Sequence, residues 1–200
     1  FTMYIPNHFK QEDNDKTMEF MQTYNFALLI SVDNELPIAT HLPFVVEVQG
    51  NSMVLFSHLS KTNPQWKSFA DKEVLVVFSE PHAYISPTLY THEKNVPTWN
   101  YIAVHAYGKI QIANSNEKKL EILYKQMQNA EESYLAQFNR LEQKYVADLL
   151  DGIVAFEIQV NQLQSKAKLS QNKTAEERKN IKEHLLSTKN TVTQEIGKQM

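Results

Sequence analysis

The strongest constraint on the fold is the alternation of apolar and polar side chains in residues 100–113 and 153–164. In the first segment, Ile102, Val104 and Ala106 alternate with Tyr101, His105 and Tyr107. Successive side chains of a strand point to opposite faces of a sheet, so each segment is predicted to be a strand with one apolar face. Strands of this kind are typical of antiparallel sheets with one covered face.

Shorter apolar segments, bounded by turn residues, predict further strands. They cover residues 24–32, 36–48, 53–57, 74–79 and 82–86, and Pro43 inside the second suits an edge or a bulge. Helices are predicted from Pro64 with Asn63 as cap, after Ser115, over residues 142–150, and after the capping box of Thr174 and Glu177. We therefore expect one α+β domain over residues 3–187, an antiparallel barrel of about six or seven strands with peripheral helices. Residues 188–200 are expected to form a polar, frayed tail.

Composition excludes several classes of function. The 200 residues contain no Cys, so thiol catalysis, thiolate metal sites and disulfides are absent. The four Gly lie too far apart for a Rossmann fingerprint or a P-loop. No apolar run approaches the about 20 residues of a membrane span, and the polar N-terminal segment predicts no secretory signal. A net charge of −3 disfavours a dedicated DNA-binding protein without excluding a local basic patch.

The most informative segment is residues 57–64, between a predicted strand and a predicted helix. It brings together Ser57, His58, Ser60, Lys61 and Asn63. Hydroxyl groups and a lysine beside a helix start can hold a phosphate without a glycine-rich loop. The alternative is that Asn63 simply caps the helix while Ser60 and Lys61 are solvated. Taken alone, the segment fits either interpretation.

Three further clusters carry groups that could contact a ligand. One follows the last predicted strand and contains Lys168, Ser170, Gln171 and Asn172, which could meet an anionic ligand or form a plain surface turn. Thr40 and His41 are polar residues inside an otherwise apolar strand. They either belong to a ligand site or face outward from an edge strand. Trp99 could stack on a planar ring or pack in the core. The seven His show no spacing typical of metal ligands, so no metal site is expected.

Taken in order, these segments resemble one known family. The matching stretches are Met3–Pro6, Ala39–Pro43, His58 with Asn63–Trp66, Pro81–Pro87, Val96–Tyr101 and Lys168–Asn172. Together they resemble the PaiB family of FMN-binding negative transcriptional regulators, from Met3 to about Leu186.

The resemblance implies an FMN-binding split barrel of the pyridoxamine-phosphate-oxidase-like kind. Two subunits would pair, with each flavin at their interface. It also implies a bacterial cytoplasmic protein that represses sporulation and degradative-enzyme genes. Mapped onto this chain, Ser60, Lys61 and Asn63 would hold the FMN phosphate, and Thr40 and His41 would line the ring or ribityl chain. The site would be closed, from the partner subunit, by Lys168, Ser170, Gln171 and Asn172.

Three functions stay open at this point. The chain is a flavin-binding regulator that acts on DNA or on a protein, a flavin-dependent oxidoreductase, or a split-barrel protein that holds haem through a sheet histidine. No helix-turn-helix and no basic stripe is evident, so binding to DNA follows from the resemblance alone. The sequence identifies no catalytic residue, and His41 and His58 are the candidates for tuning a flavin ring.

Overall fold

The computed structural model describes residues 3–50, 52–70 and 72–200. Its strands are β1 (Phe26–Asp33), β2 (Leu36–Pro43), β3 (Val45–Gln49), β4 (Ser52–Ser60), β5 (Glu73–Phe78), β6 (His82–Ile85), β7 (Thr98–Ile112) and β8 (Ile153–Lys168). The α-helices are α1 (Asn14–Thr23), α2 (Asn116–Glu131), α3 (Leu135–Phe138), α4 (Gln143–Asp151), α5 (Ala175–Ser187) and α6 (Thr191–Gln199). Short 3-10 helices are η1 (Asn7–Phe9), η2 (Pro64–Ser68), η3 (Pro87–Leu89) and η4 (Glu132–Tyr134).

The strands form an open sheet in the order β2-β1-β5-β7-β8-β4-β3, and β6 pairs with β7. The registers of β1 with β2 and β5, of β4 with β3 and β8, and of β6 with β7 are all antiparallel. The predicted α+β class with an antiparallel sheet and peripheral helices is therefore confirmed. Along β7 the alternation also holds, because Ile102, Val104 and Ala106 are buried.

Two predicted elements differ in the structure. The single strand expected over residues 36–48 is divided into β2 and β3 at Phe44, which is buried and whose N–H donates to the Asn25 carbonyl at 2.9 Å. Pro43 has no N–H to give to a ladder at this point. The helix expected from Pro64 is only the five-residue 3-10 helix η2, although Asn63 does cap it.

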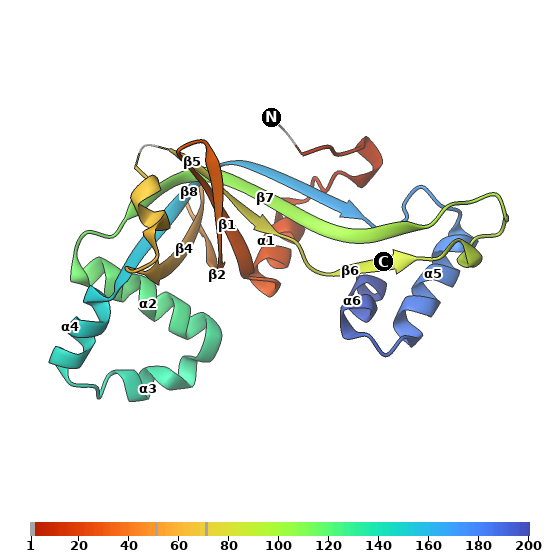
Figure 1. Ribbon diagram of the computed structural model, residues 1–200. Helices are drawn as coiled ribbons and strands as arrows, with labels where there is room; N and C mark the ends of the chain where they lie inside the picture. The colour runs from red at the N-terminus through yellow and green to blue at the C-terminus, as the bar shows by residue number, and fades with distance from the viewer. Residues whose placement is uncertain (1–2, 51, 71) are drawn as a thin grey trace. The chain divides into compact units, whose positions relative to one another are not determined.

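The chain divides into two compact units, and β7 and β8 contribute residues to both. The larger unit contains residues 18–78 and 105–163. Its core includes Phe56, Val54 and Ala155 from the sheet, and Ile122 of α2 is completely buried against them. Helix α2 thus lies over β4, with α3 and α4 following it in the chain (Figure 1).

The smaller unit contains the described residues 3–17, 79–104 and 164–200. The capping box of Thr174 and Glu177 begins α5 as predicted. Residues 191–199, expected as part of a frayed tail, form helix α6 instead. This helix packs on α5 and β6, and its Ile196 is fully buried, which stabilises a segment whose composition is mostly polar (Figure 1). Among the residues that the structure describes, no helix is long and apolar enough to cross a membrane.

Gly108 lies where β7 closely approaches β8. A Cβ at this position would lie 2.3 Å from the carbonyl oxygen of Gln159, whereas one at Gly152 would meet nothing nearer than 3.4 Å. We predict that Gly108→Ala lowers the free energy of unfolding by at least about 1 kcal/mol, because the backbone of β7 or β8 must move to make room for the Cβ. Gly152→Ala should change it by less than about 1 kcal/mol. Urea unfolding of both variants measures the difference, and equal stabilities would contradict the close approach of the two strands.

Candidate functional site

The turn that follows β4 presents hydroxyl groups and a free ammonium to solvent. The Ser60 and Thr62 hydroxyls lie 2.8 Å apart, and the Thr62 N–H donates to Ser60 Oγ at 3.3 Å. Lys61 is anchored through its backbone, because its N–H donates to the Gly152 carbonyl at 2.9 Å and its carbonyl accepts from Trp66 Nε1 at 3.1 Å. Within the described chain no residue pairs with its exposed Nζ. The turn therefore holds a fixed backbone and an unneutralised cation.

A buried amide network stands behind this turn. Gln65 is 1% exposed, and its Nε2 donates to the Leu29 and Ile38 carbonyls and to Ser31 Oγ, each at 3.2 Å. Its Oε1 accepts a hydrogen bond from Thr40 Oγ1, which in turn accepts from Asn63 Nδ2 at 3.0 Å. The network joins β1, β2 and the start of η2.

This network changes how the turn can bind an anion. The Gln65 N–H is already taken by Asn63 Oδ1 at 3.0 Å, and η2 has only five residues. The end of a short 3-10 helix with an occupied N–H offers little of the field that a long α-helix provides. An anion at this turn would therefore be held by hydroxyl groups and Lys61.

Of the other described residues of the larger unit that the sequence predicted for the site, only Thr40 contacts the turn after β4. Ser57 is fully buried, and its hydroxyl donates to the Pro43 carbonyl at 2.7 Å. His58 Nδ1 lies 2.5 Å from Gln126 Oε1 of α2. His41 is exposed on β2, where its ring stacks on Phe26 with 6.2 Å between the centroids. Thr40 is its neighbour on the strand and faces the opposite side, toward Asn63 and Gln65.

In the smaller unit, Lys168 is held at the start of β7. Its Nζ donates to Thr98 Oγ1 and, at 2.9 Å, to the carbonyl of Trp99. Burial lowers the pKa of Lys168, and the nearby charge of Lys166 lowers it further. The indole of Trp99 is half exposed; it meets the Tyr84 ring edge to face and the His82 ring at a tilt of 50°. Among the residues that the structure describes, no carboxylate lies within 4.0 Å of the ammonium of Lys166 or of Lys168.

The loop after β8 is fixed by its own polar side chains. Ser170 has φ 61° and exchanges hydrogen bonds with the fully buried Asn100, at 2.9 and 3.1 Å. The Gln171 side chain returns to the Leu169 N–H at 2.8 Å and to the Ala167 carbonyl at 2.5 Å. The side chains of Ser170 and Gln171, both predicted to contact a ligand, are thus engaged in hydrogen bonds that set the shape of the loop.

A pocket of about 230 Å³ opens beside this loop. Lys168, Lys173, Ser170 and Asn172 line it, together with Asn95. Lys173 Nζ donates to Asn95 Oδ1 at 3.1 Å and lies 3.7 Å from the centre of the Tyr90 ring. Burial, and the charge of Glu177, raise the pKa of Tyr90. The pocket is small and basic, which suits a phosphate or carboxylate group.

The structure thus brings the predicted residues together in two groups. In the larger unit, Thr40 of β2 is hydrogen-bonded to the turn that contains Ser60, Lys61 and Asn63. The smaller unit holds Lys168, Ser170, Gln171, Asn172 and Trp99. Gln65 and Asn100, which fix the two groups, were not predicted. A glutamine within Asn63–Trp66 and an asparagine on the apolar face of β7 are the signals that could have identified them.

The open antiparallel sheet with its peripheral helices defines a protein of the split-barrel class. The chain belongs to the PaiB family, since residues 3–162 match the model of the family described as "Putative FMN-binding domain". It is also 35% identical over 201 residues to the protease synthase and sporulation protein PAI 2 of Bacillus subtilis, with 99% of this chain and 96% of the relative covered. Membership assigns FMN to the chain as its cofactor.

Solved structures agree with the fold. The flavocytochrome Anf3 of Azotobacter vinelandii superposes with a TM-score of 0.64 at 12% identity, covering 82% of this chain and 72% of its own. The FAD and haem binding protein of Mycobacterium smegmatis gives 0.62 at 14% identity, covering 80% and 73%. At these identities the likeness establishes the split-barrel fold.

Replacement of Gln65 tests whether the buried amide holds the turn. We predict that Gln65→Met lowers the free energy of unfolding by about 2–3 kcal/mol, because buried carbonyl and hydroxyl groups lose their partner. Gln49→Met is the matched control, since Gln49 is exposed and its amide reaches only Glu47 at 3.4 Å. Denaturant unfolding compares the two. Equal effects would show that the amide network does not hold η2 to the sheet.

Proposed function

We propose that this chain is an FMN-binding negative transcriptional regulator that holds the flavin phosphate at the turn after β4. The observation that carries the proposal is Lys61, whose backbone is fixed by two hydrogen bonds and whose exposed ammonium has no partner among the described residues. Within a family whose cofactor is FMN, an unpaired cation in the same turn as two hydroxyl groups is the expected receptor for a dianionic phosphate.

The remaining flavin contacts follow from the same placement. Asn63 and Thr40 are ordered by Gln65 and lie next to the turn, where they can meet the ribityl chain. His41 on the open face of β2 can reach the ring from the other side of the strand. All of these groups bind and orient the cofactor, while the flavin itself supplies any redox chemistry.

The basic end of β8 and the loop that follows it complete the site from a second copy of the chain. Lys166, Lys168 and Lys173 bring positive charge without a carboxylate within 4.0 Å in the described structure. Like charges held together favour an anionic occupant. We propose a homodimer in which Lys168 and Asn172 of one subunit close over the flavin bound by the other.

The regulatory part of the proposal is supported by the relative. The Bacillus subtilis protein carries a name that refers to protease synthesis and to sporulation, and it covers nearly the full length of this chain. We propose that this chain likewise acts in the cytoplasm of a bacterium and represses sporulation and degradative-enzyme genes. The flavin would then be the bound signal, and the dimer would present the surface that meets DNA.

Lys61→Ala should weaken FMN binding by about 1–3 kcal/mol, because a charge-assisted contact to the phosphate is lost. Quenching of flavin fluorescence on titration measures the affinity. Lys67→Ala is the matched control, since this exposed lysine lies on η2 and its Nζ only approaches the Trp66 ring at 5.9 Å. Unchanged affinity in Lys61→Ala would remove Lys61 from the site.

Mixing two defective variants tests the shared site. If Lys61 and Lys168 of different subunits meet one flavin, Lys61→Ala and Lys168→Ala should each bind FMN weakly as homodimers. Subunit exchange between them should restore about a quarter of the sites to full affinity, because half the dimers are mixed and each carries one intact site. A titration that shows no high-affinity fraction after exchange, or a monomer by sedimentation, would contradict the proposal.

Regulation is tested by gel retardation of promoter DNA of sporulation and degradative-enzyme genes, with and without FMN. We predict retardation at physiological salt that depends on FMN, because sequence-specific binding survives the screening that removes non-specific contacts. Absence of retardation together with FMN-dependent oxidation of NAD(P)H would assign the chain as an oxidoreductase instead. A Soret band after incubation with haem, without a flavin spectrum, would assign it as a haem protein.

A further inference from the structure

A second pocket of the larger unit lies between α2 and the edge of the sheet. It has a volume of about 510 Å³ and is lined from β3, β4, α2 and the segment that follows α2. Of the residues predicted to bind FMN, it includes only His58. Its volume falls in the range of about 300–1,000 Å³ that is usual for sites of small organic ligands.

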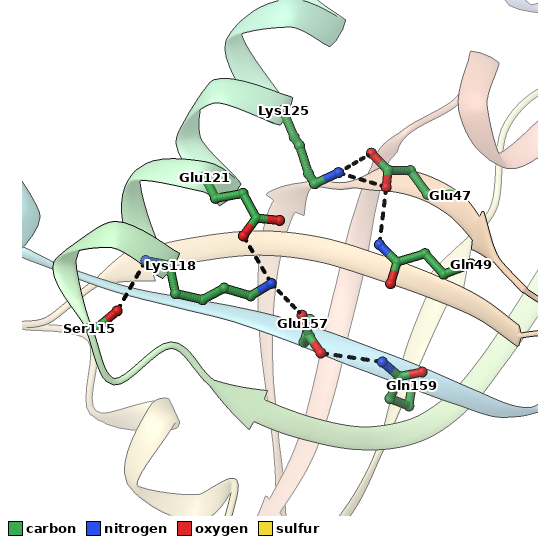
Figure 2. A network of polar contacts seen from close by, with 8 residues as sticks. All are labelled: Glu47, Gln49, Ser115, Lys118, Glu121, Lys125, Glu157 and Gln159. Carbon is green, nitrogen blue, oxygen red and sulfur yellow. Dashed lines mark hydrogen bonds and ion pairs between the residues drawn. The ribbon is translucent and has the colours of Figure 1, made fainter.

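Helix α2 is held firmly enough for this pocket to be preformed. Lys125 Nζ meets both carboxylate oxygens of Glu47 on β3, at 2.7 and 2.8 Å (Figure 2). Nearer the start of the helix, Lys118 Nζ lies 3.4 Å from a carboxylate oxygen of Glu157 on β8 (Figure 2). Ile122, which lies between the two lysines in the sequence, is completely buried. The helix is therefore tied to two strands, and the pocket wall that it forms does not depend on a ligand.

The walls are mostly apolar. Phe44 and Val45 face the pocket from the sheet side, and Leu123, Met127 and Ala130 from the helix side. Glu131 is its one acidic lining residue, and no lysine or arginine among the described residues lines it. An anion such as the FMN phosphate is therefore disfavoured here, whereas an uncharged ring system gains from burial of apolar area.

The Gln126 amide determines which nitrogen of His58 is free to accept a hydrogen bond in the pocket. Gln126 Nε2 donates to the Pro43 carbonyl at 3.3 Å, so its Oε1 is the atom that faces His58 Nδ1 at 2.5 Å. An amide oxygen can only accept, which places the hydrogen of a neutral His58 ring on Nδ1. The Nε2 atom is then an acceptor, and no described residue donates to it.

We infer that this pocket binds an uncharged, largely apolar organic molecule of two or three rings that carries one N–H or O–H group. The rings fill the space between Phe44 and Met127, and the donor reaches His58 Nε2. A cavity of about 150 Å³ already accepts benzene, so a molecule of two or three rings suits the larger volume here. This site is independent of the flavin phosphate at the turn after β4.

The probe N-phenyl-1-naphthylamine tests the inference, because it is uncharged, apolar and has a single N–H. Its fluorescence should rise on addition of the full chain, with a dissociation constant of about 0.1 mM or below. Ala130→Trp, which fills the pocket, should weaken binding at least about tenfold. Gln128→Trp is the matched control, since Gln128 is an exposed residue of the same helix and does not line the pocket. It should leave the affinity within about twofold.

His58→Phe keeps the ring and removes the acceptor, so it should weaken the probe several-fold while far-ultraviolet circular dichroism stays unchanged. Absence of a fluorescence rise in the unmodified chain, or equal loss in both Trp variants, would overturn the inference. If a second copy of the chain covers the pocket, no fluorescence rise is expected, and this outcome also overturns the inference. FMN is titrated in parallel. Loss of flavin binding with intact probe binding refutes the proposed function alone, and competition between FMN and probe refutes the separate site.

Discussion

The structure of the candidate site depends on one buried side-chain amide. The Gln65 side chain donates hydrogen bonds to the carbonyls of Leu29 and Ile38, which lie on two different strands. Its own oxygen accepts a hydrogen bond from the Thr40 hydroxyl. A buried amide costs free energy unless its donors and acceptors are paired, so this arrangement admits one position of η2 against the sheet. Asn63, Lys61 and the hydroxyl groups before it are placed as a consequence. The turn can then stay open to solvent and still keep its geometry.

The smaller unit uses the same device around a different residue. Asn100 lies on the apolar face of β7, fully buried, and fixes the Ser170 backbone in a left-handed conformation through two hydrogen bonds. Ser170 lines a small basic pocket together with Lys168 and Asn172. In both units a buried amide side chain orders a segment that lies next to a lysine, Lys61 in one unit and Lys168 in the other. In the function that we propose, one unit supplies the receptor for the flavin phosphate and the other supplies groups that cover the flavin.

The sheet was predictable because its strands alternate with a period of two, and alternation depends only on which face is buried. The same reasoning located Asn63 as a cap and the capping box at Thr174, since both follow from short-range hydrogen bonding. The sequence-based prediction failed where contacts between residues distant in the sequence determine the local structure. Helix α6 is stabilised by burying Ile196 against its neighbours, and η2 is shortened because Gln65 turns into the sheet. The division of the predicted residues between two units depends on chain topology, which composition and spacing do not contain.

Our main proposal is that the phosphate of the flavin, and not its ring alone, is recognised at the turn after β4. Fluorescence quenching can compare the affinities of FMN and riboflavin for the unmodified chain, because the two ligands differ only in the phosphate. We expect FMN to bind at least about tenfold more tightly, and added inorganic phosphate to narrow the difference. Equal affinities for the two flavins, insensitive to phosphate, would show that the turn does not bind the phosphate.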